Sequence, residues 1–140
     1  MTKPLAVITG ASSGIGEATA KAFSNAGYPT LLLARRIEIM ESFNLKNSIC
    51  KKIDVRDRDA LVSAIREAEK QYGPTDMMFN NAGVARLADI STQDPSEWDE
   101  MIDVNTKGVM NGIYAVMKDM KARKSGTIVN LSSLAGRKVD

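Results

Sequence analysis

Hydrophobic residues in this chain alternate between short unbroken runs and stretches at helical spacing. The first run, Leu5 to Ile8, predicts a buried strand. A helix is expected next, ending at Gly27, which can cap its C-terminus. Its apolar positions fall on one predicted stripe, made of Ile15, Ala18, Ala22, Phe23 and Ala26. The first unit is therefore a strand, a glycine-rich turn and a helix.

The same alternation continues along the chain. Further strands are predicted over residues 30–34, 48–53, 77–79 and 127–131, with a short helix over 37–43. The next helix should bury Leu61, Val62, Ile65, Ala68 and Tyr72 and stop at Gly73-Pro74. This order predicts an α/β fold with a doubly wound parallel sheet. No linker composition or internal repeat divides the chain, so we expect one domain.

The sequence Asp94-Pro95-Ser96-Glu97 predicts the start of a long helix. Asp94 can cap free backbone amides, Pro95 suits the first turn, and Glu97 stands where a capping box needs it. The helix should continue to about Arg123.

A glycine-rich turn, TGASSGIG at residues 9–16, lies between the first strand and the first helix. A dinucleotide site in that position needs a tight turn, a backbone without Cβ atoms near the pyrophosphate, and the free amides of a helix N-terminus. An ordinary strand-to-helix turn is the alternative interpretation. The candidate binding residues are Gly10, Ser12, Ser13, Gly14, Ile15 and Gly16.

Charge and composition narrow the possible partners. The 140 residues carry 19 basic and 17 acidic side chains, so no strong field favours nucleic acid or a membrane surface. The single Cys50 and the lack of histidine argue against an internal disulfide, a metal site and thiol redox chemistry. Since no apolar run reaches eighteen residues, we expect a soluble protein, and the cysteine usage fits the cytoplasm.

Several motifs together resemble the short-chain dehydrogenase/reductase family. TGASSGIG is similar to that family's TGxxxGxG, and NNAG at residues 80–83 is similar to a motif that borders the cofactor ribose, which implicates Asn81, Ala82 and Gly83. Asp54-Val55 resembles the dipeptide that brackets adenine, although Asp54 or Asp57 could instead cap the following helix.

The resemblance also implies an architecture. It implies a Rossmann-like doubly wound sheet, truncated here after the fifth strand. Residues 1–140 would then form the N-terminal NADP(H)-binding part of a single short-chain dehydrogenase domain.

The end of the second strand indicates which nicotinamide cofactor is used. An acidic residue there accepts hydrogen bonds from the ribose hydroxyls of NAD, whereas a basic residue pairs with the extra phosphate of NADP. The chain has Ala34-Arg35-Arg36 at this place, so NADP(H) is favoured, with Arg35 the stronger candidate. A solvated basic turn is the alternative, above all for Arg36.

The family resemblance also suggests catalytic residues. Ser132-Ser133 follows the fifth strand, and Ser133 aligns with the serine that holds the substrate oxygen; a serine-rich turn capping the next helix is the alternative. Asn105 resembles the asparagine that interrupts its helix and holds a water in the proton relay. An asparagine inside a helix is unfavourable and therefore needs a reason.

The family's acid is a tyrosine followed four residues later by a lysine, and the spacing would put both past Asp140. Tyr114 and Lys118 match Tyr-x-x-x-Lys, but they precede the serine and share a helix with Asn105. We therefore expect a packing tyrosine and a solvated lysine there, and we expect the 140-residue chain alone to be inactive.

The sequence thus predicts an NADP(H)-dependent oxidoreductase acting on a small alcohol or carbonyl, with a 3-hydroxy acid as one substrate class. A non-catalytic NADP(H)-binding sensor or interaction module is the alternative. We expect a homo-oligomer, either a dimer or a tetramer.

Overall fold

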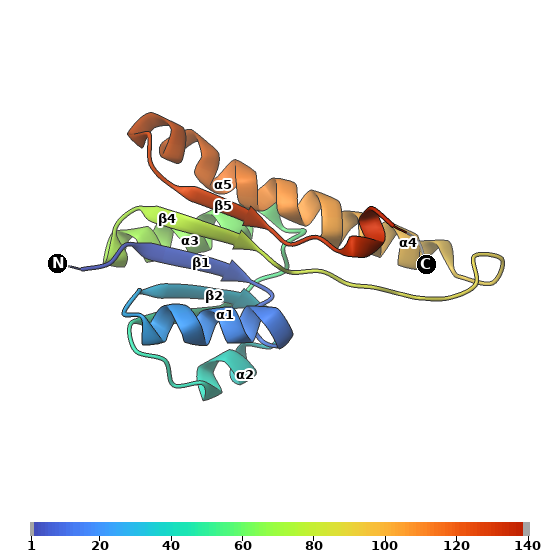
Figure 1. The fold of residues 1–140 in the computed structure, drawn as a ribbon, viewed down its shortest axis with the longest axis horizontal. Coiled ribbons are helices and arrows are strands. Elements are labelled where there is room, and N and C mark those ends of the chain that lie inside the picture. The colour runs from blue at the N-terminus through green and yellow to red at the C-terminus, as the bar shows by residue number, and fades with distance from the viewer. Residues whose placement is uncertain (1, 139–140) are drawn as a thin grey trace.

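A parallel sheet forms the centre of the computed structural model, which describes residues 2–138 (Figure 1). Its strands are β1 (Leu5–Thr9), β2 (Thr30–Ala34), β3 (Ser48–Lys52), β4 (Thr75–Asn80) and β5 (Thr127–Asn130). The five strands lie in the order β3-β2-β1-β4-β5, and every neighbouring pair is parallel. The predicted Rossmann-like α/β architecture is therefore confirmed.

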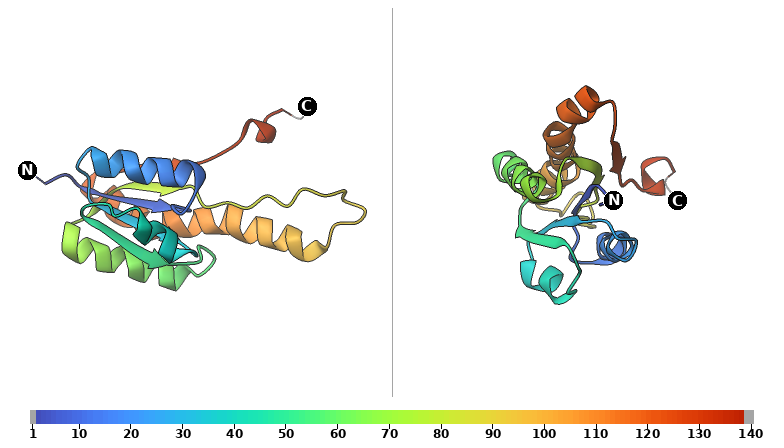
Figure 2. Two further views of the ribbon diagram at one scale, coloured as in Figure 1. Left: turned by 90° about the horizontal axis from the view of Figure 1, so that it is seen from below. Right: turned by 90° about the vertical axis from the view of Figure 1, so that its left-hand side faces the viewer.

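Helices cover both faces of the sheet (Figure 2). Helices α1 (Gly14–Asn25) and α2 (Ile37–Ser42) lie on one face, and α3 (Arg58–Tyr72) and α5 (Gly108–Arg123) on the other. Helix α4 (Pro95–Ile102) and the loop before it project beyond the sheet as an arm. A short 3-10 helix, η2 (Leu134–Gly136), follows β5. No helix in residues 2–138 is long and apolar enough to cross a membrane.

Two apolar clusters hold the layers together, because successive strand residues point to opposite faces. On the side of α3 and α5, the cluster is built on Leu5, Val7, Leu31, Leu33 and Met78. The α3 residues Leu61, Ile65 and Ala68 are buried in it, with Val62 and Tyr72 partly buried beside them, which confirms the predicted face. On the other side, the cluster includes Ile8, Ala20, Leu32, Met40 and Phe79.

The predicted apolar stripe of α1 is wrong. Ile15, Ala18, Ala22 and Ala26 are exposed and Phe23 is only partly buried, whereas Gly16 and Ala20 are buried. A Cβ on Gly16 would lie 2.1 Å from the Gly10 carbonyl oxygen, so the helix approaches the turn through the face that carries its smallest residues. Alanine and glycine define no hydrophobic stripe strongly enough for periodicity to identify that face.

The long helix predicted from residue 95 to 123 is interrupted by a π-helical turn, η1 (Asp103–Lys107), between α4 and α5. As predicted, Asp94 caps the start, and its carboxylate accepts a hydrogen bond from the Ser96 amide at 2.8 Å. The helix also ends at Arg123 as expected, with Lys124 in the left-handed conformation. The interruption contains Asn105, a residue type that is unfavourable inside a regular helix.

Candidate functional site

The strand order reverses between β1 and β4, because β1 continues to β2 on one side while β4 lies on the other. In open α/β sheets, ligands bind at the carboxyl ends of the strands at such a reversal. A cleft of about 750 Å³ opens there. Among the predicted site residues, it is lined by Gly10, Ser12, Ser13, Ile15, Arg35, Arg36, Asp54, Val55, Asn81, Ala82 and Gly83.

The three glycines of the turn are required for different reasons. Gly10 has a φ of +63°, and a Cβ there would lie 2.9 Å from the Ala82 Cα. Gly16 allows the close approach of helix and turn described above. Gly14 has a φ of +54° and only open space where a Cβ would stand. Gly14 and Gly16 lie outside the cleft lining, so packing inside the protein, rather than contact with a ligand, accounts for Gly16.

The N-terminus of α1 is left without a side-chain cap. Ser13 occupies the capping position with extended backbone, but its hydroxyl accepts no hydrogen bond from the first-turn amides. Both Ser13 and Ile15 line the cleft. Uncapped amides carry the positive end of the helix dipole, so this end of the cleft suits an anion such as a diphosphate. The glycine turn and helix therefore fit the cofactor that the sequence predicts.

The NNAG segment is fastened to the glycine turn. The Asn81 side-chain amide donates to the carbonyl oxygens of Thr9 and Gly10, at 3.1 and 3.2 Å. The backbone amides of Asn81 and Ala82 both donate to the buried Thr9 hydroxyl oxygen, at 3.0 Å each. These bonds join the ends of β1 and β4, which makes the segment more than a plain turn. Sequence reasoning missed Thr9, whose role depends on a contact 72 residues away.

Two arginines and a lysine line the cleft beside the carboxyl end of β2. Arg35 and Arg36 are exposed and line the cleft, and Arg36 Nη2 lies 3.4 Å from Ser12 Oγ, so it donates a long hydrogen bond to the glycine turn. Lys52, which pairs with Ala34 in the β2–β3 register, also lines the cleft. Periodicity places Lys52 only in a strand, so sequence reasoning missed it. Three cations at one end suit a phosphate.

Asp54 is held by its neighbour Arg56. The two groups form a bidentate pair with a shortest distance of 2.6 Å, and the Arg56 backbone amide also donates to the Asp54 carboxylate. These hydrogen bonds from Arg56 lower the pKa of Asp54, and the charge of Arg35 acts in the same direction. Of the two aspartates considered as helix caps, Asp57 caps α3 through the Ala60 amide. Asp54 is thus an ionised acceptor at the cleft wall.

Asn105 lies in the π-turn and is exposed, outside the cleft lining. Its side-chain carbonyl accepts from the Val84 amide at 2.8 Å, and its NH₂ donates to the Val84 carbonyl at 2.7 Å. Val84, the partner in these bonds, and Val104, the residue before Asn105, both line the cleft. Asn105 therefore fixes the backbone directly after the NNAG segment.

Ser133 is exposed and also lies outside the cleft lining, two residues after Leu131, which does line it. Its hydroxyl accepts a hydrogen bond from the Ala135 amide at 3.2 Å and so caps η2, as the alternative interpretation expected. A capping oxygen can still donate its own proton to a second group, so this contact leaves the hydroxyl chemically available.

Tyr114 and Lys118 lie on α5, away from the cleft lining. Tyr114 is 67% exposed, and the Arg58 guanidinium lies 5.6 Å from the centroid of its ring. The predicted packing tyrosine is therefore wrong, because Tyr114 faces outward from α5, whereas Lys118 is exposed as predicted.

Comparison with known proteins gives a consistent result. The model of the family described as short chain dehydrogenase matches residues 4–139. An uncharacterized oxidoreductase of Listeria monocytogenes is 42% identical over 138 residues, which cover 94% of this chain and 56% of the relative. The chain thus spans little more than half the length of that curated relative.

Two solved structures that carry the cofactor are also similar. The closed form of serine dehydrogenase complexed with NADP+ has a TM-score of 0.91 at 28% identity, covering 97% of this chain and 56% of that one. A metagenomic short-chain oxidoreductase in complex with NADP has a TM-score of 0.89 at 33% identity, covering 98% and 65%.

Proposed function

The chain belongs to the short-chain dehydrogenase family, and from this premise we propose that the protein is an oxidoreductase that transfers a hydride between NADP(H) and a small alcohol or carbonyl. Residues 1–140 would form the cofactor-binding part of a single catalytic domain. The length of the Listeria relative supports this division, since the matched residues cover 56% of it.

One observation carries the proposal: the uncapped N-terminus of α1 and a group of basic residues line one and the same cleft. The α1 amides would bind the diphosphate, and Arg35 and Arg36 would bind the 2′-phosphate. Asp54 and Val55, which also line the cleft, would hold the adenine. The serine dehydrogenase and the metagenomic oxidoreductase, both solved with NADP, support this cofactor by similarity.

Isothermal titration calorimetry of the full-length protein with NADP and with NAD tests the proposal. We expect both to bind and NADP to bind at least tenfold more tightly, because each additional charge-assisted contact contributes about 1.5–3 kcal/mol. No heat of binding with either nucleotide would remove the dehydrogenase assignment. Equal affinities would remove only the preference for NADP.

In the proposed reaction, the bound nicotinamide supplies or accepts the hydride. The Ser133 hydroxyl would donate a hydrogen bond to the substrate oxygen, which stabilises the charge that develops there. Asn105 would hold a water of the proton relay with its backbone. Its side chain holds the Val84 backbone through two hydrogen bonds, which fixes the position of this turn. The tyrosine and lysine that complete the family's site would come from beyond residue 140.

The substrate class we propose is a small 3-hydroxy acid or the corresponding carbonyl compound. Residues 94–98 and 133–138 resemble those of a bacterial branch of the family that oxidises small 3-hydroxy acids and related alcohols. Serine is itself a 3-hydroxy acid, so the similarity to a serine dehydrogenase supports it. Initial rates with NADP and a panel of 3-hydroxy acids, against 2-hydroxy acids of equal length, test this choice.

A non-catalytic NADP(H) sensor is the second candidate, since a fold does not fix a function. The η2 cap favours it, because the Ser133 hydroxyl already has a structural role. A Tyr-x-x-x-Lys sequence soon after residue 140 would support the enzyme. Tight NADP binding without turnover on any alcohol or carbonyl would support the sensor.

We also propose a homo-oligomer, and we expect neither nucleic acid nor a membrane as partner. The near balance of charge supports the second point. The half-buried free Cys50 fits a cytoplasmic location.

A further inference from the structure

Helix α5 contacts Val55, which belongs to the segment proposed to hold the adenine. Asn111 on this helix is 4% exposed and does not line the cleft. Its side-chain NH₂ donates to the Val55 carbonyl at 2.8 Å, and its side-chain oxygen accepts from Arg58 Nε at 2.9 Å. Val55 itself lines the cleft. One buried amide thus ties the wall residue and the start of α3 to α5.

The side chain of Val55 is fixed by the same helix. A Cβ added to Gly108 would lie 2.6 Å from Val55 Cγ2 and 3.2 Å from its Cβ. The absence of a side chain at Gly108 therefore lets Val55 pack directly against the backbone of α5. Together, Gly108 and Asn111 determine both the carbonyl and the side-chain position of Val55.

A second part of the cleft lining is fixed from the turn that leads into α5. Asn105 in the π-turn makes its two hydrogen bonds to the backbone of Val84, which lines the cleft like Val55. Two lining residues of the cleft therefore depend on one continuous stretch, residues 105–111.

We propose that Asn111 is a positioning residue for the adenosine half of the cofactor. This inference rests on the proposed function. If Asn111 lost its side-chain NH₂, the Val55 carbonyl would be buried without a hydrogen-bond partner. The Asp54-Val55 segment would then move. Asn111 acts through Val55 and touches no cofactor atom, so its loss should affect binding of the adenosine half and spare the nicotinamide half.

The test uses the full-length protein and two halves of the cofactor, adenosine 2′,5′-bisphosphate and reduced nicotinamide mononucleotide, by calorimetry. In Asn111→Asp, a carboxylate oxygen replaces the NH₂ and faces the Val55 carbonyl, while the acceptor for Arg58 remains. We expect the bisphosphate to bind about tenfold more weakly. The mononucleotide should bind unchanged.

A second variant and a control make the result specific. Gly108→Ala should give the same selective weakening through the Val55 side chain. Thr75→Val is the matched control: Thr75 is also a buried polar residue, but it bonds Glu69 at the other end of the sheet, so its loss should lower stability without changing either affinity.

The outcomes separate this inference from the proposed function. Unchanged bisphosphate affinity in folded Asn111→Asp and Gly108→Ala would overturn the positioning role and leave the proposed function intact. Equal weakening of both halves would also overturn it. If the unmodified protein binds neither the bisphosphate nor NADP, the proposed function itself is wrong.

Discussion

Arg35 and Arg36 are neighbours in sequence but differ in their surroundings. Arg36 reaches back to Ser12 in the glycine turn. Arg35 lies close enough to two carboxylates, Asp54 and Glu100, for its charge to lower the pKa of both. The main cause of the low pKa of Glu100 is its hydrogen bonding with Arg86. A carboxylate introduced at position 35 would therefore be repelled by the carboxylates of Asp54 and Glu100.

This arrangement predicts distinct effects for two substitutions of Arg35. Arg35→Gln removes the cation, so we expect NADP to bind about 10- to 100-fold more weakly and NAD to be almost unaffected. Arg35→Asp should also turn the preference toward NAD, because a carboxylate can accept from the ribose hydroxyls. Dissociation constants measured by calorimetry for both nucleotides check this. Unchanged NADP/NAD ratios in both variants would remove Arg35 from the phosphate site.

Ser133 and Tyr114 form a second contrast at the residue scale. Ser133→Ala should lower turnover of the full-length enzyme by roughly 10²-fold or more with little change in NADP affinity, as expected for a group that acts in the transition state. Tyr114→Phe should be nearly neutral, because its ring is largely exposed and apart from the cleft. Steady-state kinetics with both variants decide this. Full activity in Ser133→Ala, or lost turnover in folded Tyr114→Phe, would reverse the assignments.

At the scale of elements, the glycine turn and α1 act as one unit. The Gly16 hydrogen faces the Gly10 carbonyl, so Gly16→Ala must push the helix away from the turn. Overpacking of this kind costs about 1–3 kcal/mol. Gly14→Ala meets no atom but retains a positive φ, which costs about 1–2 kcal/mol through the backbone alone.

We therefore expect Gly16→Ala to weaken NADP binding by about tenfold or more and to lower the melting temperature by on the order of 5 °C. Gly136→Ala is the matched control, since no atom lies within 4 Å of its Cβ position and its φ is not positive. Differential scanning fluorimetry with and without NADP measures both quantities. A Gly16→Ala protein that matches the Gly136→Ala control would contradict the close approach.

The sequence predicted best those elements whose position depends on residues close together in the chain. Apolar runs predicted most strands to within a residue or two, β3 was predicted from a segment of mixed polarity, and the Asp94 cap predicted the start of α4. Periodicity failed on α1, because its buried face is set by a close backbone approach at Gly16 rather than by large apolar residues. The links from Thr9 to Asn81 and from Asn111 to Val55 join segments more than fifty residues apart, which no local pattern reveals.

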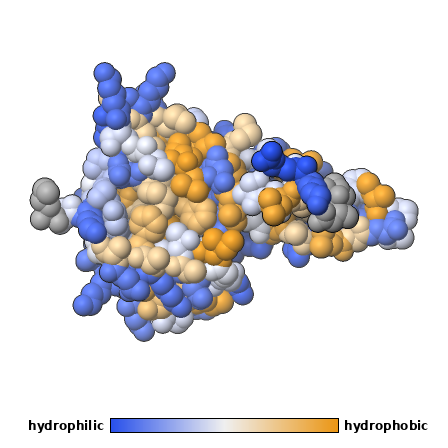
Figure 3. Space-filling view, in the orientation of Figure 1, coloured by the Kyte–Doolittle hydropathy of each residue, from blue (hydrophilic) through white to orange (hydrophobic). Residues whose placement is uncertain are grey.

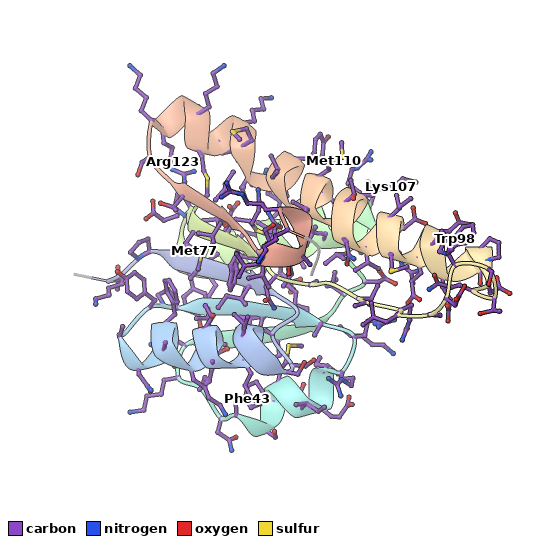
Figure 4. All side chains as sticks on the ribbon, turned by 45° about the vertical axis from the view of Figure 1, so that its right-hand side comes forward. Phe43, Met77, Trp98, Lys107, Met110 and Arg123 are labelled. Atoms are coloured by element: carbon purple, nitrogen blue, oxygen red, sulfur yellow. The ribbon has the colours of Figure 1, made fainter. Side chains whose placement is uncertain are left out.

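At the scale of the whole molecule, apolar side chains remain on two surfaces. Figure 3 shows one of them in the middle of the face that carries β4 and β5. The other follows the outer side of α5, where Met110, Tyr114 and Met117 are 61%, 67% and 46% exposed at helical spacing. In Figure 4, Met110 lies on the side of α5 away from the sheet, and Trp98 lies near the end of the α4 arm.

The α5 surface predicts the subunit contact of the proposed homo-oligomer. In a two-fold dimer the same patch meets itself, so a charge introduced there faces its own copy. Met110→Glu combined with Met117→Glu should therefore dissociate full-length assemblies into smaller species in sedimentation-velocity experiments, by burying repelling carboxylates. Lys70→Glu on α3 changes the net charge by the same amount and should leave the assembly intact. If the double variant sediments like the unmodified protein, this helix face is not the subunit contact; if the unmodified protein is a monomer, the homo-oligomer prediction is wrong.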